Sequence, residues 1–137
     1  MVRLAEQGDG AALASLFVQL GYPALEAGVS QGLMQPDPAR EVLVACMAEA
    51  VVGVLVWHHL QPLHVAPAWG LISALVVDDS ARSLGVGARL LATVEERARV
   101  AGCMQLELSS SLKREGAHRF YLGQGYLERP KRFVKVI

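Results

Sequence analysis

Apolar positions along this chain recur at a spacing of two in some stretches and of three to four in others, which predicts strands and helices in alternation. Val2 to Ala5 predicts a short strand, and a helical pattern begins at Asp9 and runs to Leu20. A weaker helical pattern covers Ala24 to Met34. Glu41 to Met47 and Ala50 to Leu60 are β-branched runs joined by a tight reversal. These two runs predict a hairpin.

A strand, a long helix and a second strand are predicted next. The strand covers Trp69 to Asp78, the helix Val86 to Ala101 and the second strand Met104 to Ser109. A right-handed crossover through the helix makes the two strands parallel. On the outer face of the helix, Glu95 and Arg99 have the spacing of an ion pair. The buried stripe of the helix is predicted to be Leu90, Leu91, Val94 and Ala98.

The carboxyl-terminal stretch predicts smaller elements. Gly116 to Leu122 has the pattern of a short helix, and Tyr126 with Phe133 to Ile137 predicts a final antiparallel pair. The sequence contains no linker-like or repeated segment. Its 137 residues are therefore predicted to form one domain, residues 1–137.

Composition and charge exclude several classes of partner. The chain is 53% apolar, which is ample for a core, and its thirteen basic and thirteen acidic residues balance. A neutral chain has no global field for nucleic acid or for an anionic membrane. The longest uncharged stretch, Val51 to Val77, is interrupted by histidines and prolines and does not predict a membrane helix. Cys46 and Cys103 lack metal-type spacing, and without a leader pattern we expect free thiols in a cytoplasmic protein.

A glycine-bearing loop separates the predicted strand from the long helix, and it reads Arg82-Ser83-Leu84-Gly85-Val86-Gly87. Glycine lets main chain approach a ligand closely, and the N–H groups that open a helix attract anions. A nucleoside-triphosphate loop would need Lys and then Ser or Thr where Ala88 and Arg89 stand. A dinucleotide fold would need a tighter turn and a small residue in place of Leu90. The loop therefore predicts an anion site of another kind.

The motif R-x-x-G-x-G, placed here between a predicted strand and a predicted helix, resembles the pyrophosphate loop of the GCN5-related N-acetyltransferases (GNAT). A second resemblance lies in Ala117-His118-Arg119-Phe120-Tyr121 followed by Gly125-Tyr126, similar to the family segment in which a helix ends in Phe-Tyr. Together the two motifs cover roughly residues 41 to 137 in family order. The resemblance implies an acetyl-CoA-dependent N-acetyltransferase of α/β (α+β) class. Its fold would be a mixed, mostly antiparallel sheet, splayed at the centre and flanked by helices.

The resemblance also implies the site residues. The pantetheine arm would pair with the main chain of the central strand like an added strand, and the diphosphate would lie on the loop. Tyr121 matches the family position whose hydroxyl protonates the departing sulfur, and a phenol with a reference pKa of about 10 can donate at neutral pH. The implied coenzyme-binding residues are Leu75, Val76, Val77, Arg82, Ser83, Leu84, Gly85, Val86, Gly87, Ala88, Ser110 and Phe120.

The general base is not assigned by the motifs. A primary amine with a pKa of about 10.4 is mostly protonated at pH 7 and must lose a proton before it attacks. Many relatives carry a glutamate on the central strand, but Leu71 to Leu75 has no carboxylate. His58, His59 and His64 are the nearest titratable candidates, with Asp78 at the loop entrance as a lesser one. A metal site from the three histidines lacks an evident fourth ligand, so no metal is predicted.

Within the family, the segments Lys113 to Leu122 and His58 to His64 resemble aminoalkylphosphonate N-acetyltransferases, some of which use a divalent cation. Leu71 and Ala74 depart from that pattern, because acidic residues are expected there. The prediction is acetyl transfer to a primary amine of a small molecule by direct attack in a ternary complex. A protein or peptide acceptor, or a regulatory module that binds acyl-CoA without transfer, stays open, as does a homodimer. Cations available for a phosphonate or a coenzyme phosphate are Lys113, Arg114, Arg119, Arg129, Lys131 and Arg132.

Overall fold

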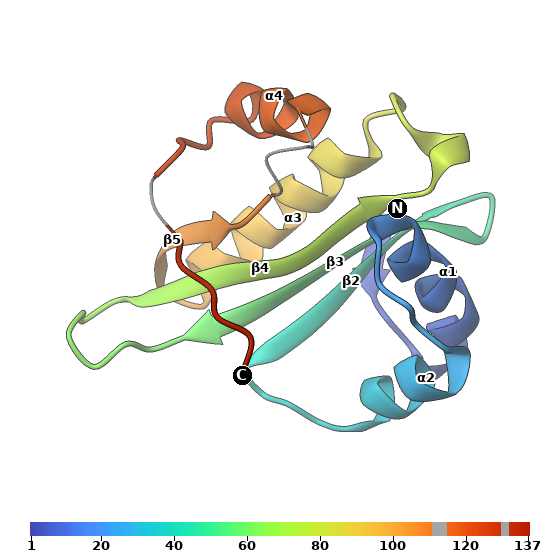
Figure 1. Cartoon of the computed structure of the whole chain (residues 1–137), viewed down its shortest axis with the longest axis horizontal. Coiled ribbons are helices and arrows are strands. Elements are labelled where there is room, and N and C mark those ends of the chain that lie inside the picture. Colours follow the sequence, from blue (N-terminus) through green and yellow to red (C-terminus); the bar gives the residue numbers. More distant parts are fainter. Residues whose placement is uncertain (111–114, 130–131) are drawn as a thin grey trace.

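The computed structural model describes residues 1–110, 115–129 and 132–137, and within them a five-stranded sheet is flanked by helices (Figure 1). The strand order is β1-β2-β3-β4-β5, with antiparallel pairs up to β4 and a parallel β4–β5 pair. This is the predicted mixed, mostly antiparallel architecture. The strands are β1 (Val2–Leu4), β2 (Arg40–Met47), β3 (Ala50–Leu60), β4 (Ala68–Val77) and β5 (Cys103–Leu108), and the helices are α1 (Gly10–Leu20), α2 (Glu26–Met34), α3 (Val86–Val100) and α4 (Glu115–Gly123).

The β2–β3 hairpin turns at the two residues that the sequence indicated. Ala48 and Glu49 have φ angles of 48° and 68°. Tight two-residue hairpin turns of this kind require a positive φ at both central residues, because their twist matches that of the strands. The predicted hairpin is therefore confirmed, although neither residue is a glycine.

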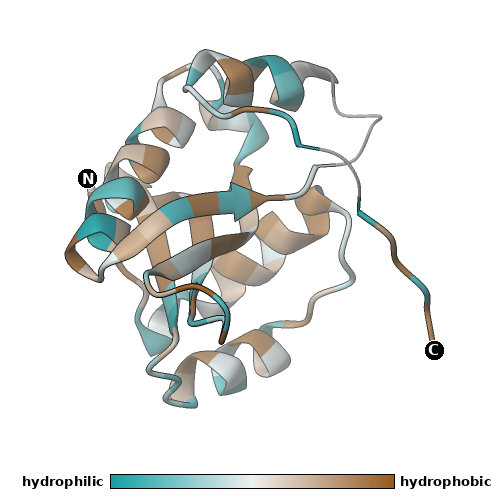
Figure 2. Cartoon of the chain, turned by 90° about the vertical axis from the view of Figure 1, so that its left-hand side faces the viewer, coloured by the Kyte–Doolittle hydropathy of each residue, from teal (hydrophilic) through white to brown (hydrophobic). Residues whose placement is uncertain are grey.

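Two hydrophobic cores fill the two faces of the sheet (Figure 2). On one face, α1 contributes Leu13 and Leu16, which pack on strand residues that include Val54; we call this the α1-side core. On the other face, α3 buries the predicted stripe against residues that include Leu55; we call this the α3-side core. Helical spacing in the sequence thus identified the packing face of α3 correctly.

The β4–β5 pair is parallel, and it covers only part of β4. Its register runs from Ala68↔Cys103 to Ile72↔Leu108. Beyond Ile72, no described residue pairs with the β5-facing edge of β4, although β4 continues to Val77. The sheet is therefore open between the two strands, as the fold prediction required.

A β-bulge in β4 lies where the opening begins. On β3, Val56 and Trp57 are adjacent, but their partners on β4 are Ala74 and Ile72, so Ser73 is an extra residue. The bulge changes which face alternate side chains occupy. Ile72 packs in the α3-side core, and after the bulge Leu75 packs there too.

The predicted carboxyl-terminal strand pair is wrong for the described residues. Tyr126 and residues 132–137 are in no strand, and Phe133 and Ile137 are almost fully exposed. A short apolar run forms a strand only where an edge and a packing face receive it, and Tyr126 packs on α3 instead. The expected Glu95–Arg99 pair is also wrong.

The other polar contacts of α3 explain why that pair fails. The hydroxyl of Tyr126 donates to Glu95 Oε2 at 3.0 Å, while Arg99 pairs with Glu96 at 3.2 Å.

Cys46 and Cys103 are free, half-buried thiols, and burial raises the pKa of Cys103. Among the helices of the described ranges, none is long and apolar enough to cross a membrane.

Candidate active site

The loop before α3 presents main-chain donors. A 3-10 turn, η2 (Asp79–Ala81), leads into it, and the helix begins at Val86 with Gly85 at the N-cap in a left-handed conformation, φ 81°. The N–H of Arg89 is bonded to the carbonyl of Gly85 at 3.1 Å. In an α-helix the N–H groups before this one have no intrahelical partner, so those of Val86 to Ala88 point out of the helix. Together with the helix dipole they favour an anion.

The strand end before the loop is held in place by Asp78. Its carboxylate accepts hydrogen bonds from the N–H of Ser80 at 3.0 Å and from Gln19 Nε2 of α1 at 2.8 Å. These bonds, those from Ser80 foremost, lower the pKa of Asp78. Gln19 in turn accepts from the N–H of Asp79 at 3.1 Å. Asp78 thus fixes the entrance to the loop, and its carboxylate, engaged in these hydrogen bonds and with a lowered pKa, is a weak base.

Arg82, the first residue of the motif, lies on the surface beside the loop. Its guanidinium pairs with Asp79 at 2.8 Å, and both side chains are largely exposed. An exposed pair of this kind contributes little stability, so the guanidinium can exchange its partner for a phosphate at small cost.

Helix α4 brings the second sequence motif against the loop. A Cβ on Gly87 would lie 3.1 Å from Cζ of Phe120, which is tighter than an ordinary contact, so the ring packs closely against the bare main chain of the first turn of α3. Tyr121 follows, with ring-centroid distances of 5.4 Å to Phe120 and 6.1 Å to Tyr126. Burial, and then Glu95, raises the pKa of Tyr126. The two motifs, more than thirty residues apart in sequence, therefore lie against each other.

Along the free edge of β4, the main-chain N–H and C=O groups of successive residues point alternately toward β3 and toward the opening. The N–H of Asp78 donates to the carbonyl of Val52 at 2.7 Å. Since an antiparallel ladder bonds every second residue, Val76 bonds to β3, whereas Leu75 and Val77 direct N–H and C=O toward the opening. On the far side of the opening, Ser110 follows β5 and is half-buried.

The three histidines lie in different surroundings. Nε2 of His58 is 2.8 Å from Oγ of Ser73, the bulge residue. Nε2 of His59 is 3.3 Å from the carbonyl of Ala101, at the far end of α3, and His64 lies edge-on against Trp69 at 5.9 Å. Within the described ranges, no group of three or more His, Cys, Asp and Glu side chains is placed to hold a metal ion.

Of the cations considered for an anionic substrate, those in the described residues are exposed. Arg119 on α4 is exposed, and so are Arg129 and Arg132 near the carboxyl terminus. Lys113, Arg114 and Lys131 lie outside the described residues.

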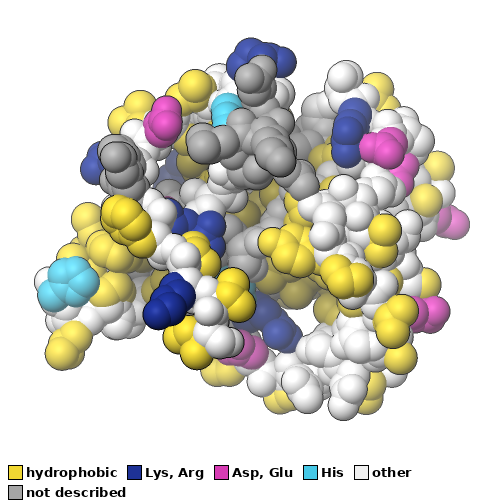
Figure 3. Space-filling view, viewed as in Figure 1, with side chains coloured by type: hydrophobic (Ala, Val, Ile, Leu, Met, Phe, Trp, Pro, Cys, Tyr) yellow, Lys and Arg dark blue, Asp and Glu magenta, His cyan; other side chains and the backbone are white. Residues whose placement is uncertain are grey.

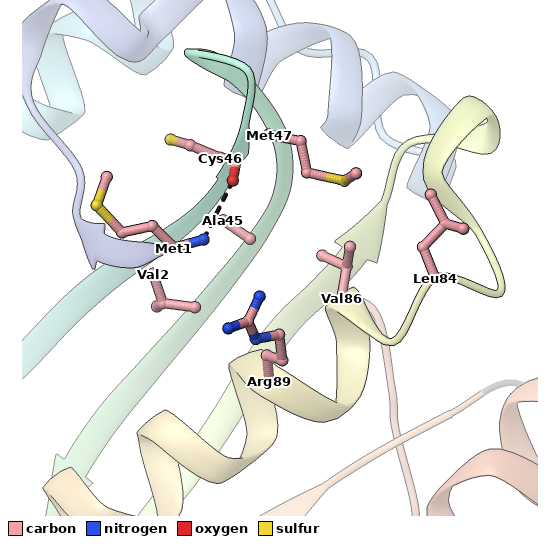
Figure 4. A pocket seen from close by; sticks show the side chains of 8 residues that line it. All are labelled: Met1, Val2, Ala45, Cys46, Met47, Leu84, Val86 and Arg89. Carbon is pink, nitrogen blue, oxygen red and sulfur yellow. Dashed lines mark hydrogen bonds between the residues drawn. The ribbon is translucent and has the colours of Figure 1, made fainter.

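Two hollows of the surface are lined by residues other than those of the free edge of β4. A pocket of about 80 Å³ lies between the amino-terminal strand pair and the start of α3, with Leu84 and Arg89 on one wall and Met1 on the other (Figure 4). It is far below the roughly 300 Å³ of a small-molecule site. A wider hollow, about 580 Å³, is bordered by Glu41 and Arg97 near the end of α3. The molecule is also hollowed between the α1–α2 side and the carboxyl-terminal segments (Figure 3).

Comparison with known proteins agrees with this geometry. The model of the acetyltransferase (GNAT) family matches residues 12–126. An aminoalkylphosphonate N-acetyltransferase of Salmonella typhimurium is 40% identical over 119 residues, which is 87% of this chain and 76% of that enzyme.

Solved structures show the same fold at lower identity. A transcriptional regulator from Bacillus halodurans has a TM-score of 0.91 at 22% identity, covering 100% of this chain and 99% of the other. A GNAT family acetyltransferase from Staphylococcus aureus has a TM-score of 0.85 at 22% identity, covering 100% and 98%.

Proposed function

Because the chain belongs to the acetyltransferase (GNAT) family and is an acetyl-CoA-dependent N-acetyltransferase, we propose that its acceptor is the primary amine of a small molecule. The observation that carries this proposal is the 40% identity, over 87% of the chain, to an enzyme named for aminoalkylphosphonates. We propose that class as the first acceptor to test. The chain has a net charge of zero, so it has no global field that would attract or repel a charged molecule. A small acceptor that carries both an ammonium and a phosphonate would therefore be recognised by local groups of the site.

The coenzyme site is proposed at the loop and along the free edge of β4. The N–H groups of Val86 to Ala88 point outward, and the exposed guanidinium of Arg82 lies beside them. Both suit a diphosphate, which is doubly anionic and accepts hydrogen bonds. The main chain of Leu75 and Val77 faces the opening and can pair with the amides of the pantetheine arm. Bound acetyl-CoA supplies the acetyl thioester.

Tyr121 is proposed as the proton donor to the leaving thiol. Its ring lies in the α4 segment that packs on the first turn of α3, next to Phe120. A phenol is protonated at neutral pH and can donate its proton to the sulfur as the bond to the acetyl group breaks. The chain thus combines an anion-binding loop, an edge that orients the arm and an acid.

The experiment measures CoA release with a panel of aminoalkylphosphonates, polyamines, amino acids and a peptide with a free amino terminus. Turnover with aminoalkylphosphonates above the other amines supports the proposal, whereas preference for the peptide overturns it. Tyr121→Phe is expected to bind CoA like the wild type and to lose about 100-fold in kcat. Tyr22→Phe is the matched control, because Tyr22 is exposed beyond the end of α1. Equal kcat values in both variants would exclude Tyr121 as the acid.

A further inference from the structure

The free edge of β4 determines where an extended arm must end. This argument rests on the proposed function. An arm that starts at the loop can follow the edge from Val77 to Ser73, four residue steps or roughly 14 Å. It can go no further, because β5 occupies the edge from Ile72 onward. The reacting end of the arm therefore lies next to the bulge.

Ser73 and His58 meet at this point. Val56 belongs to the α1-side core and Trp57 to the α3-side core, so alternation directs His58 to the α1 face of the sheet. There its Nε2 lies 2.8 Å from Oγ of Ser73. His58 is half-buried, so its ring is held by the sheet but open to a small molecule.

The other titratable groups considered for this role are placed elsewhere. His59 points to the opposite face and contacts the carbonyl of Ala101, at the end of α3 remote from the loop. His64 is exposed in the loop after β3. Asp78 is held by Ser80 and Gln19. Register thus separates His58 from His59, and His64 lies outside the strands.

We propose that His58 accepts the proton that the acceptor ammonium must lose, and that the hydroxyl of Ser73 passes it on. The ammonium N–H gives its proton to Oγ of Ser73 while the hydroxyl proton of Ser73 moves to Nε2 of His58. The products are a neutral amine and an imidazolium, so charge and protons balance. The amine then approaches the thioester from the α1 face, whereas Tyr121 packs with the α3-side core.

The charged group that faces His58 in the described sheet is Arg40. It is the direct partner of His58 on β2, and its guanidinium donates to the carbonyls of Gly32 at 2.9 Å and Gln35 at 3.3 Å. On β4 the direct partner is the uncharged Leu71. Arg40 is thus anchored to the end of α2.

The first test replaces the three histidines one at a time by glutamine. At pH 7, His58→Gln is expected to lower kcat/KM for the amine about 100-fold, whereas His59→Gln and His64→Gln stay within about twofold of the wild type. The loss should shrink about tenfold per pH unit toward the pKa of the acceptor, because a neutral amine needs no base. A purely structural defect would not recover with pH. Thermal unfolding and CoA binding of the variants show that they fold.

A second test does not depend on turnover. Aminoethylphosphonate added to 15N-histidine-labelled protein without acetyl-CoA should move the ring signals of His58 and leave those of His59 unchanged. Ser73→Ala should weaken that response and lower kcat at least tenfold at pH 7. If the wild type turns over while His58→Gln matches it, or if the His58 signals stay still when the amine binds, the inference is wrong. If the wild type acetylates no small amine, the proposed function itself fails.

Discussion

Two glycines at opposite ends of α3 allow the anion-binding role of the loop to be separated from its backbone strain. Gly85 and Gly102 have φ angles of 81° and 82°, and a Cβ built on either would meet nothing within 4 Å. Alanine therefore adds no clash at either position and only strains the left-handed backbone, by about 1–2 kcal/mol. For a chain of 137 residues, each substitution should lower Tm by roughly 3–6 °C.

The two variants should differ in binding, although they match in stability. Gly85→Ala disturbs the N–H groups offered to a diphosphate, and losing one hydrogen bond to a charged group removes about 1.5–3 kcal/mol. Its Kd for CoA should rise about tenfold to a hundredfold in calorimetry, while Gly102→Ala binds like the wild type. Urea unfolding provides the stability comparison. The reasoning is refuted if Gly85→Ala keeps full affinity, or if the two free energies of unfolding differ by more than about 1 kcal/mol.

Two further predictions concern contacts that hold α3. Glu41 accepts from Arg97 Nε at 2.7 Å and from Trp57 Nε1 at 3.0 Å, and Arg97 lowers its pKa. Glu41→Gln should therefore lower the free energy of unfolding by about 1 kcal/mol at pH 7, since partial exposure screens the pair. The difference from wild type should vanish as pH falls below about 4.5 and through the folded pKa of Glu41. Urea titrations at several pH values measure this difference, and its persistence at pH 2 would contradict the prediction. Tyr126→Phe removes the bond to Glu95 and should cost about 1 kcal/mol in the same assay, without changing the Kd for CoA.

Local sequence signals predicted the parts of the fold that depend on neighbouring residues. The stripe on α3 and the reversal at Ala48 and Glu49 are set by spacing and by turn geometry, and both are confirmed. The carboxyl-terminal pair at Phe133 to Ile137 failed, because strand formation there depends on an edge far away in sequence. Alternating apolar residues show only that a segment can be a strand.

The candidate site shows the same limit. The sequence pointed to the loop through two glycines, and the structure gives each a local backbone reason: Gly85 has a positive φ, and Phe120 approaches Gly87 closely. The surroundings of His58, by contrast, depend on the register between β3 and β4 and on a bulge that no sequence pattern marks. In the sequence His58 and His59 look alike until strand pairing assigns them to opposite faces of the sheet.

The extra residue in β4 has a consequence for any attempt to regularise this sheet. Deleting Ser73 would make Ile72 and Ala74 neighbours, and these two residues already face opposite sides of the sheet, as their partners Trp57 and Val56 do. The ladder would become continuous while both cores kept their side chains. The packing of the interior therefore does not require the additional residue, and what Ser73 adds to the strand is a polar group at the margin of the opening.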